Sequence, residues 1–209
     1  MINKLHYISQ QTAQRSHLDN IQAACEAGCQ LIQLRIKNEM HENILPVATA
    51  AKALCDRYNA LLIINDYPHI AAAVDAAGVH VGLQDMTVAE ARAIVGRQKI
   101  VGGTANTLAD ILTHVRNGAS YVGLGPFRFT TTKQNLSPVL GLEGYRTIMT
   151  ALREQQVHTP VVAIGGILET DIPAIIQTGI HGIAVSGLIT QSAGQQPLVQ
   201  HIYELLNKQ

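Results

Sequence analysis

Charge is scarce in this sequence of 209 residues, and neither sign prevails. Only 14% of the residues are charged, and 15 Lys and Arg balance 15 Asp and Glu, so the formal net charge is zero. A chain without a global basic field has no general attraction for nucleic acid or for an anionic membrane surface. We therefore expect neither as a partner, and any bound anion must be held by local groups.

Cysteine and long apolar runs are also lacking. Cys25, Cys29 and Cys55 are an odd number without the spacing of a disulfide framework, which favours reduced, buried thiols. No second pair or suitably placed histidine completes a zinc site. No apolar run approaches the roughly 20 residues that span a bilayer, and residues 1–5 lack the features of a signal peptide. These absences predict a cytoplasmic protein.

What the sequence does have is 47% hydrophobic residues, arranged in short runs that alternate with segments of helical spacing. Eight strands alternating with helices indicate parallel β-α units, and eight is the number that closes a barrel. We therefore predict one domain over residues 1–209, an α/β fold of the (β/α)8 TIM-barrel class. The strand-like runs are 5–8, 31–36, 61–64, 78–81, 99–102, 121–124, 161–164 and 182–186.

Glycines mark the expected helix ends. Gly28, Gly118 and Gly179 each follow a helical segment and precede a strand, where a left-handed cap is favoured. An open doubly wound sheet is the alternative, but no Gly-x-Gly-x-x-Gly follows the first strand. In a barrel the active site lies at the C-terminal ends of the strands, so polar residues there are the candidates. The helical segments are 19–26, 44–58, 88–95, 108–117, 142–153, 171–177 and 197–206, with a short alanine-rich one after strand three.

Acidic and amide side chains follow two neighbouring strands. Asn65 and Asp66 come directly after strand three, and Asp85 follows strand four. Neighbouring strands lie about 5 Å apart, so both carboxylates can reach one point. Carboxylates and an amide suit a hard cation such as Mg²⁺ held for a phosphate substrate. The alternative is structural, with Asn65 and Asp66 as turn residues and Asp85 as a helix N-cap.

Two cations follow strand two. Gln33, Arg35 and Lys37 alternate with Leu34 and Ile36, so on an extended strand the three polar side chains share one face. At the barrel mouth, Arg35 would bind a pyrophosphate as a planar fork and Lys37 would bind it as a point charge. The alternative is that these cations pair with neighbouring Asp or Glu.

Strands four and five supply weaker candidates. Gly102 and Gly103 allow the backbone to approach a ligand, and Thr104 or Asn106 could donate to a phosphate oxygen. Alternatively, Asn106 caps the following helix. His80 on strand four either faces the pocket or is a satisfied core histidine. No catalytic triad follows from the spacing of the histidines.

Strand six leads into the longest irregular segment of the chain. Arg128, Thr130, Thr132 and Lys133 stand in it, and their hydroxyls and cations would cradle an oxyanion. A long loop in a compact domain is typical of a binding loop. A solvated polar loop is the alternative.

Glycine turns follow the last two strands. Gly165-Gly166 and Ser186-Gly187 stand where barrels commonly bind phosphate through backbone N–H groups. With the carboxylates and cations after strands two to four, this makes two separated phosphate sites. A reaction that joins a diphosphate to a monophosphate substrate would need both.

Six motifs carry these residues in a specific order. They are Gln33-x-Arg35-x-Lys37, Ile64-Asn65-Asp66, Gly78-Val79-His80-Val81-Gly82-x-x-Asp85, Gly123-x-Gly125-Pro126, Thr130-x-Thr132-Lys133 and Ala163-Ile164-Gly165-Gly166-Ile167. Their order and spacing resemble those of the thiamine phosphate synthase family over nearly the whole chain. The resemblance implies a barrel transferase of thiamine biosynthesis that couples hydroxymethylpyrimidine diphosphate to hydroxyethylthiazole phosphate, or its carboxylated form, and releases pyrophosphate. It also implies Mg²⁺ as cofactor and departure of pyrophosphate before the thiazole nitrogen attacks.

Residue roles follow from the same resemblance. It makes Asp66 and Asp85 the Mg²⁺ ligands, and gives Arg35, Lys37 and Lys133 the catalytic contacts with the diphosphate. The other contacts that it implies are Asn65 and Thr104 to the diphosphate, Gln33 and His80 to the pyrimidine, and Thr130, Thr132 and the backbone of Gly166, Ser186 and Gly187 to the thiazole phosphate.

Some positions depart from the family pattern. Thr104 stands in place of serine, Phe129 in place of proline, and the strand-eight end reads Ser186-Gly187. The related thiazole tautomerase is one alternative, although its characteristic histidine is replaced by Asn106. A catalytically silent barrel that binds thiamine precursors is another. The sequence leaves the oligomeric state open, a homo-oligomer included.

Overall fold

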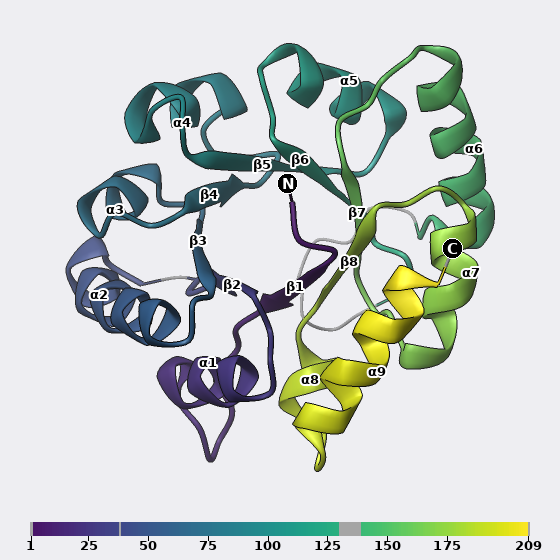
Figure 1. Cartoon of the computed structure of the whole chain (residues 1–209). Helices are drawn as coiled ribbons and strands as arrows, with labels where there is room; N and C mark the ends of the chain where they lie inside the picture. The colour runs from purple at the N-terminus through teal and green to yellow at the C-terminus, as the bar shows by residue number, and fades with distance from the viewer. Residues whose placement is uncertain (1, 38, 130–138, 209) are drawn as a thin grey trace.

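A closed barrel of eight parallel strands, surrounded by helices, is the architecture of the chain (Figure 1). The computed structural model describes residues 2–37, 39–129 and 139–208. The strands follow one another around the barrel in chain order, and the last pairs with the first. The (β/α)8 prediction is therefore confirmed and the open sheet is wrong. The strands are β1 (Leu5–Ile8), β2 (Leu31–Leu34), β3 (Leu61–Asn65), β4 (Gly78–Val81), β5 (Ile100–Ala105), β6 (Tyr121–Leu124), β7 (Val161–Ile164) and β8 (Gly182–Val185).

Strand β2 ends earlier than the sequence predicts. Its pairing with β3 stops where Leu34 lies opposite Ile64, and the next backbone N–H, that of Arg35, donates instead to the Ser9 hydroxyl at 3.1 Å. Only Gln33 of the three alternating polar residues is therefore on the strand. Arg35 and Lys37 lie in the segment that follows it, beyond the rim of the barrel.

Side-chain caps set the start of three helices. Ser16, Thr87 and Thr107 each accept a hydrogen bond from the backbone three residues on and form capping boxes. The α8 helix was not expected, because four residues are too short for a periodic pattern. The helices are α1 (His17–Glu26), α2 (His41–Arg57), α3 (Pro68–Ala73), α4 (Val88–Val95), α5 (Leu108–Arg116), α6 (Gly141–Glu154), α7 (Ile172–Gln177), α8 (Gly187–Thr190) and α9 (Gln195–Asn207), with a 3-10 turn, η1 (Glu169–Asp171).

The predicted glycine caps are confirmed by the backbone. Gly28, Gly118 and Gly179 have φ values of 101°, 80° and 94°, the region that L side chains rarely adopt. The three cysteines are free and buried, as expected. None of the helices in the described ranges has the length and apolarity that crossing a membrane requires.

Two layers of side chains make up the core. The outward faces of the strands and the inward faces of the helices form a continuous apolar cluster. Inside the barrel a smaller cluster contains Ile8, Tyr121, Val162 and Ala184, with the fully buried His6 against Tyr121. The barrel interior therefore contains the polar rings of His6 and Tyr121, which lie below the candidate site.

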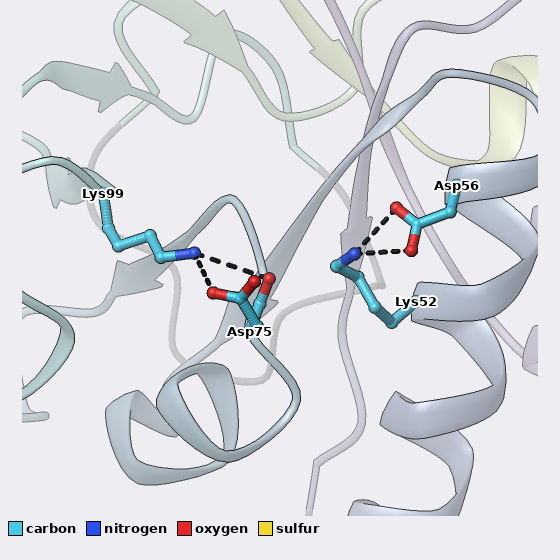
Figure 2. A network of polar contacts seen from close by, with 4 residues as sticks. All are labelled: Lys52, Asp56, Asp75 and Lys99. Atoms are coloured by element: carbon cyan, nitrogen blue, oxygen red, sulfur yellow. Dashed lines mark hydrogen bonds and ion pairs between the residues drawn. The ribbon is translucent and has the colours of Figure 1, made fainter.

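The N-terminal end of the barrel, opposite the strand ends that carry the candidate site, has surface ion pairs (Figure 2). Asp75 follows α3 and pairs with Lys99, while Lys52 and Asp56 pair along α2. The Asp75 side chain is 83% exposed, and exposed pairs contribute about 0–1 kcal/mol. Although Asp75 lies on the same segment as Asp66, the two carboxylates lie at different ends of the barrel.

Candidate active site

A hydrogen bond between two amides begins the site at the ends of β2 and β3. Gln33 Nε2 donates to Asn65 Oδ1 at 2.6 Å, and both side chains are almost fully buried. No other described residue hydrogen-bonds the Gln33 carbonyl oxygen or the Asn65 amide protons, which are therefore available to a ligand. The structure thus brings together two residues that the sequence analysis placed on neighbouring strand ends.

Asp66 turns the chain at the end of β3. Its backbone is left-handed at φ 68°, and its N–H donates to the His80 carbonyl at 2.8 Å. Asp and Asn tolerate this conformation better than other non-glycine residues. The turn aims the carboxylate at Lys37, with which it forms an ion pair. Asp66 therefore both forms the turn and points its carboxylate into the site.

Asp85 brings the second carboxylate to the same point. Its Oδ2 accepts a hydrogen bond from the Gly82 N–H at 2.9 Å. A Cβ placed on Gly82 would lie 2.5 Å from that oxygen and 4.0 Å from Asp66 Oδ1, so both carboxylates converge on this glycine. The alternative in which Asp85 caps a helix is wrong, since Thr87 caps α4.

The electrostatics of this pair favour a cation. Burial raises the pKa of Asp66 to about 6, against the opposing pull of Lys37 and with a further contribution from Asp85. Two carboxylate oxygens suit Mg²⁺, which usually keeps several waters and takes further oxygens from substrate phosphates. No group of three or more His, Cys, Asp or Glu in the described part of the chain is placed to hold a metal. The donor set therefore fits a shared, partly hydrated Mg²⁺ and does not form a closed protein cage.

Arg35 differs from Lys37 in having no carboxylate partner. Within the described ranges it takes part in no ion pair, and its guanidinium is half-buried. Burial lowers the pKa of Arg35, while the nearby Asp66 charge opposes that shift. The structural alternative of acid pairing thus applies to Lys37 alone. Arg35 keeps its donors for an anion.

Thr104 and His80 are joined across β4 and β5. His80 Nε2 lies 2.9 Å from Thr104 Oγ1, and His80 Nδ1 lies 3.0 Å from the Tyr121 hydroxyl. His80, the candidate for binding the pyrimidine, is therefore hydrogen-bonded to Thr104, a candidate for binding the diphosphate. Tyr121 was not identified from the sequence. The available signal was a polar ring on β6 opposite the glycines of the neighbouring strand β5.

Asn106 has a structural position. Its side-chain amide donates to the Gly125 carbonyl, and its backbone N–H donates to Asp110 Oδ2 at 3.0 Å. The prediction that Asn106 caps the next helix is wrong by one residue, because Thr107 is the cap. Asn106 ties the end of β5 to the end of β6.

Arg128 is occupied by protein partners. Its guanidinium binds Asp171 through two hydrogen bonds of 2.8 and 3.0 Å and donates to the Gly166 carbonyl at 2.7 Å. A cradling role for Arg128 around an oxyanion is therefore wrong, since its donors stabilise the glycine turn after β7. Thr130, Thr132 and Lys133, with which it was grouped, lie outside the described residues.

The glycine turns lie on neighbouring strand ends. Gly165 and Gly166 have φ values of 98° and 67°, and a Cβ on Gly166 would lie 3.1 Å from the Phe129 carbonyl oxygen. Directly after β8, Ser186 donates its hydroxyl to Gln10 Oε1 at 3.2 Å, and Gly187 begins α8. Backbone N–H groups of these turns are the available donors for a phosphate.

A cavity of about 720 Å³ lies at the other end of the barrel, and its cations have structural roles. Lys4 donates to the Leu206 carbonyl near the end of α9, and Arg153 is in the last turn of α6. Cations at helix C-termini compensate the helix dipole. The polar mouth of the barrel is therefore the better candidate for chemistry.

A (β/α)8 barrel whose mouth has acids and cations on one side and glycine turns on the other defines a class of enzyme that acts on phosphorylated small molecules. The model of the thiamine monophosphate synthase family matches residues 5–189. The chain belongs to this family, whose synthases are transferases.

Relatives agree over nearly the full length. The thiamine-phosphate synthase of Flavobacterium johnsoniae is 50% identical over 206 residues, covering 99% of this chain and 97% of the relative. That of Bacteroides fragilis is 50% identical over 188 residues, covering 90% and 92%. Among solved structures, a thiamine phosphate pyrophosphorylase from Pyrococcus furiosus has a TM-score of 0.84 and 30% identity, with 98% and 96% coverage.

Proposed function

We propose that this chain couples hydroxymethylpyrimidine diphosphate to hydroxyethylthiazole phosphate in a Mg²⁺-dependent reaction that gives thiamine phosphate and pyrophosphate, or to the carboxylated form of the thiazole with release of CO2 as well. The observation that carries the proposal is the convergence of Asp66, Asp85 and Lys37 on one point, beside an Arg35 that forms no ion pair with a carboxylate of the described residues. With Mg²⁺ held by the two carboxylates, this set would have the positive charge that a departing diphosphate requires. The names of the full-length relatives support the same activity.

Asp66 and Asp85 would hold Mg²⁺. When bound, the ion supplies charge neutralisation for the leaving pyrophosphate. The Asp85 carboxylate is held by the hydrogen bond from the Gly82 N–H, and the Asp66 backbone N–H is held by its hydrogen bond to the His80 carbonyl, so both residues are placed before substrate arrives. Fixed donors need no reorganisation during the reaction.

The chain's own cations hold the leaving group from the other side. Arg35 would bind it as a fork, and Lys37 would exchange part of its contact with Asp66 for phosphate oxygens. We assign Lys133 the same role from its place in the family motif. Asn65 and Thr104 add neutral donors at the ends of β3 and β5. Stabilising the leaving group is the main catalytic work, so no protein nucleophile is needed.

The two heterocycles would be bound on either side of this set of carboxylates and cations. Gln33 and His80, deep at the strand ends, would contact the pyrimidine. The N–H groups of Gly166, Ser186 and Gly187, with the hydroxyls of Thr130 and Thr132, would bind the thiazole phosphate. Bound in this way, the thiazole would face the carbon from which pyrophosphate departs.

The test is turnover by the pure protein. With both substrates and Mg²⁺ we expect pyrophosphate and thiamine phosphate in equal amounts, and neither product when one substrate or Mg²⁺ is left out. Conversion of a thiazole carboxylate isomer without coupling would identify a tautomerase instead. Binding of both substrates without any turnover would identify a silent barrel.

A further inference from the structure

Tyr121 places a hydroxyl group in the middle of the barrel. Its side chain is 1% exposed, and its hydroxyl lies 3.0 Å from His80 Nδ1. Burial raises the pKa of Tyr121, so the group is a neutral phenol with a proton to donate. Within the described part of the chain, His80 Nδ1 is the acceptor in reach of that proton. A buried donor without an acceptor is unfavourable, so the hydrogen bond runs from Tyr121 to His80.

This direction determines the tautomer of His80. Because Nδ1 accepts, the imidazole proton lies on Nε2. Nε2 faces Thr104 Oγ1 at 2.9 Å, so His80 donates and the threonine oxygen accepts. The reverse tautomer would set two protons against each other between His80 and Tyr121.

The hydroxyl proton of Thr104 is then left for a ligand. Among the described residues the threonine oxygen bonds to His80, and none of them accepts its proton. Thr104 is half-exposed near the C-terminal end of β5, at the mouth where the diphosphate is proposed to bind. A hydroxyl whose lone pair is engaged by a fixed donor points its proton in fewer directions than a free one.

The neighbouring strands leave space for these rings. A Cβ on Gly102 would overlap the Tyr121 ring and lie 2.7 Å from His80 Nδ1. A Cβ on Gly123 would lie 3.2 Å from His80 Cε1. From below, His6 packs its ring edge-on against Tyr121 at 4.9 Å. The ring positions are therefore set by packing as well as by hydrogen bonds.

We propose that Tyr121 is a positioning residue that, by fixing the tautomer of His80, orients the Thr104 hydroxyl to donate to the diphosphate of the substrate. The proposal rests on the proposed function for the identity of that anion. It extends the proposed function by adding a buried residue that touches neither substrate.

The first test uses the unmodified protein. Nitrogen-15 NMR of the histidine rings distinguishes the two neutral tautomers and the imidazolium, and His80→Gln identifies the His80 signals by their loss. We expect His80 protonated at Nε2 with Nδ1 as acceptor, at neutral pH and without substrate. A proton on Nδ1 would overturn the proposal, whatever activity the protein has.

The second test is a double-mutant cycle on kcat/KM for the diphosphate substrate. We expect Tyr121→Phe and Thr104→Val each to lower it about 10-fold, the double variant to be no worse than Thr104→Val, and Thr104→Ser to retain activity. KM for the thiazole phosphate should stay unchanged. Additive losses, or an unaffected Tyr121→Phe, would overturn the proposal.

The matched control is Tyr145→Phe, which also removes a buried phenol hydroxyl, here one that donates to the Leu124 carbonyl at 2.9 Å. It should leave the kcat/KM for the diphosphate substrate unchanged. An unmodified protein that does not turn over would refute the proposed function, and the NMR result would still decide the tautomer. If Tyr121→Phe does not fold, that NMR result is decisive.

Discussion

Lys37 and Asp66 form an ion pair that joins the segment after β2 to the end of β3, and its two partners differ in exposure. The lysine side chain is 41% exposed, whereas the aspartate side chain is 9% exposed. The carboxylate is thus held in place, and the ammonium group is the partner that can move. Such a pair can separate when a diphosphate arrives, with the lysine following the phosphate and the carboxylate left for Mg²⁺.

Removing the lysine should therefore weaken leaving-group stabilisation. We expect Lys37→Ala to lower kcat for coupling about 100-fold, because the departing diphosphate loses one of the charges that stabilise it. Lys37→Arg should retain more activity, because the charge remains. The measurement is steady-state pyrophosphate release at saturating Mg²⁺. Lys52→Ala, which removes an exposed lysine paired with Asp56 on α2, should behave like the unmodified protein.

The two carboxylates should be needed for turnover but not for folding. We expect Asp66→Asn and Asp85→Asn each to lower Mg²⁺-dependent activity by at least about 100-fold while circular dichroism stays unchanged. Asp75→Asn is the matched control, since Asp75 belongs to the same segment but pairs with Lys99 at the other end of the barrel (Figure 2). Full activity in both active-site variants would remove the metal assignment.

The raised pKa of Asp66 should give a pH dependence to the proposed Mg²⁺ binding. Burial favours the protonated carboxyl in the folded state, so without metal its contribution to stability is present at low pH and is lost as the pH rises through about 6. Mg²⁺ binds the ionised form and competes with the proton. We expect the rise in Tm caused by Mg²⁺ to be small at pH 5 and larger at pH 7.5. In Asp66→Asn this pH dependence should disappear.

His6 should make the fold sensitive to acid. Burial lowers the pKa of His6 from 6.5 to about 4. The unfolded chain therefore takes up a proton below pH 6.5 that the folded state does not take up until about pH 4, and the free energy of unfolding falls across that interval by about 3 kcal/mol. His6→Phe, which keeps a ring against Tyr121, should reduce the slope. Urea unfolding at pH 7, 5.5 and 4 measures it, and an unchanged slope would contradict the assignment.

The Arg128–Asp171 pair should act on one substrate only. Because Arg128 also holds the Gly166 carbonyl, Asp171→Asn should loosen the glycine turn after β7. We expect KM for the thiazole phosphate to rise about 3-fold with KM for the diphosphate unchanged, since the Arg128 side chain is 43% exposed and solvent screens the pair. Initial rates with each substrate varied in turn measure the two constants. Asp56→Asn, which breaks an exposed pair, is the control.

The fold could be predicted because the sequence repeats one local pattern eight times. Strands such as β4 and β6 have the expected bounds, since a short apolar run between turn residues fits little else. Alternation failed just after β2, where no partner strand continues the ladder beyond Leu34. A period-two pattern cannot reveal where pairing stops.

The site was predictable as a set of strand ends and not as a set of contacts. Asp66, Asp85 and Lys37 do converge, because parallel strands bring their C-terminal ends together. The partners of Arg128 could not be foreseen, since Asp171 is 43 residues away in the chain. Tyr121 was missed for a related reason: its role depends on which side of the barrel wall it faces.

The glycines opposite the barrel rings also constrain how this sequence can diverge. Gly102 lies directly across the β5–β6 ladder from Tyr121, and its missing side chain is the space that the ring fills. A larger residue at 102 is compatible only with a smaller one at 121, and a smaller residue at 121 leaves a void that 102 could fill. Substitutions at these positions in related sequences should therefore compensate for each other, so Gly102 and Tyr121 are expected to change together.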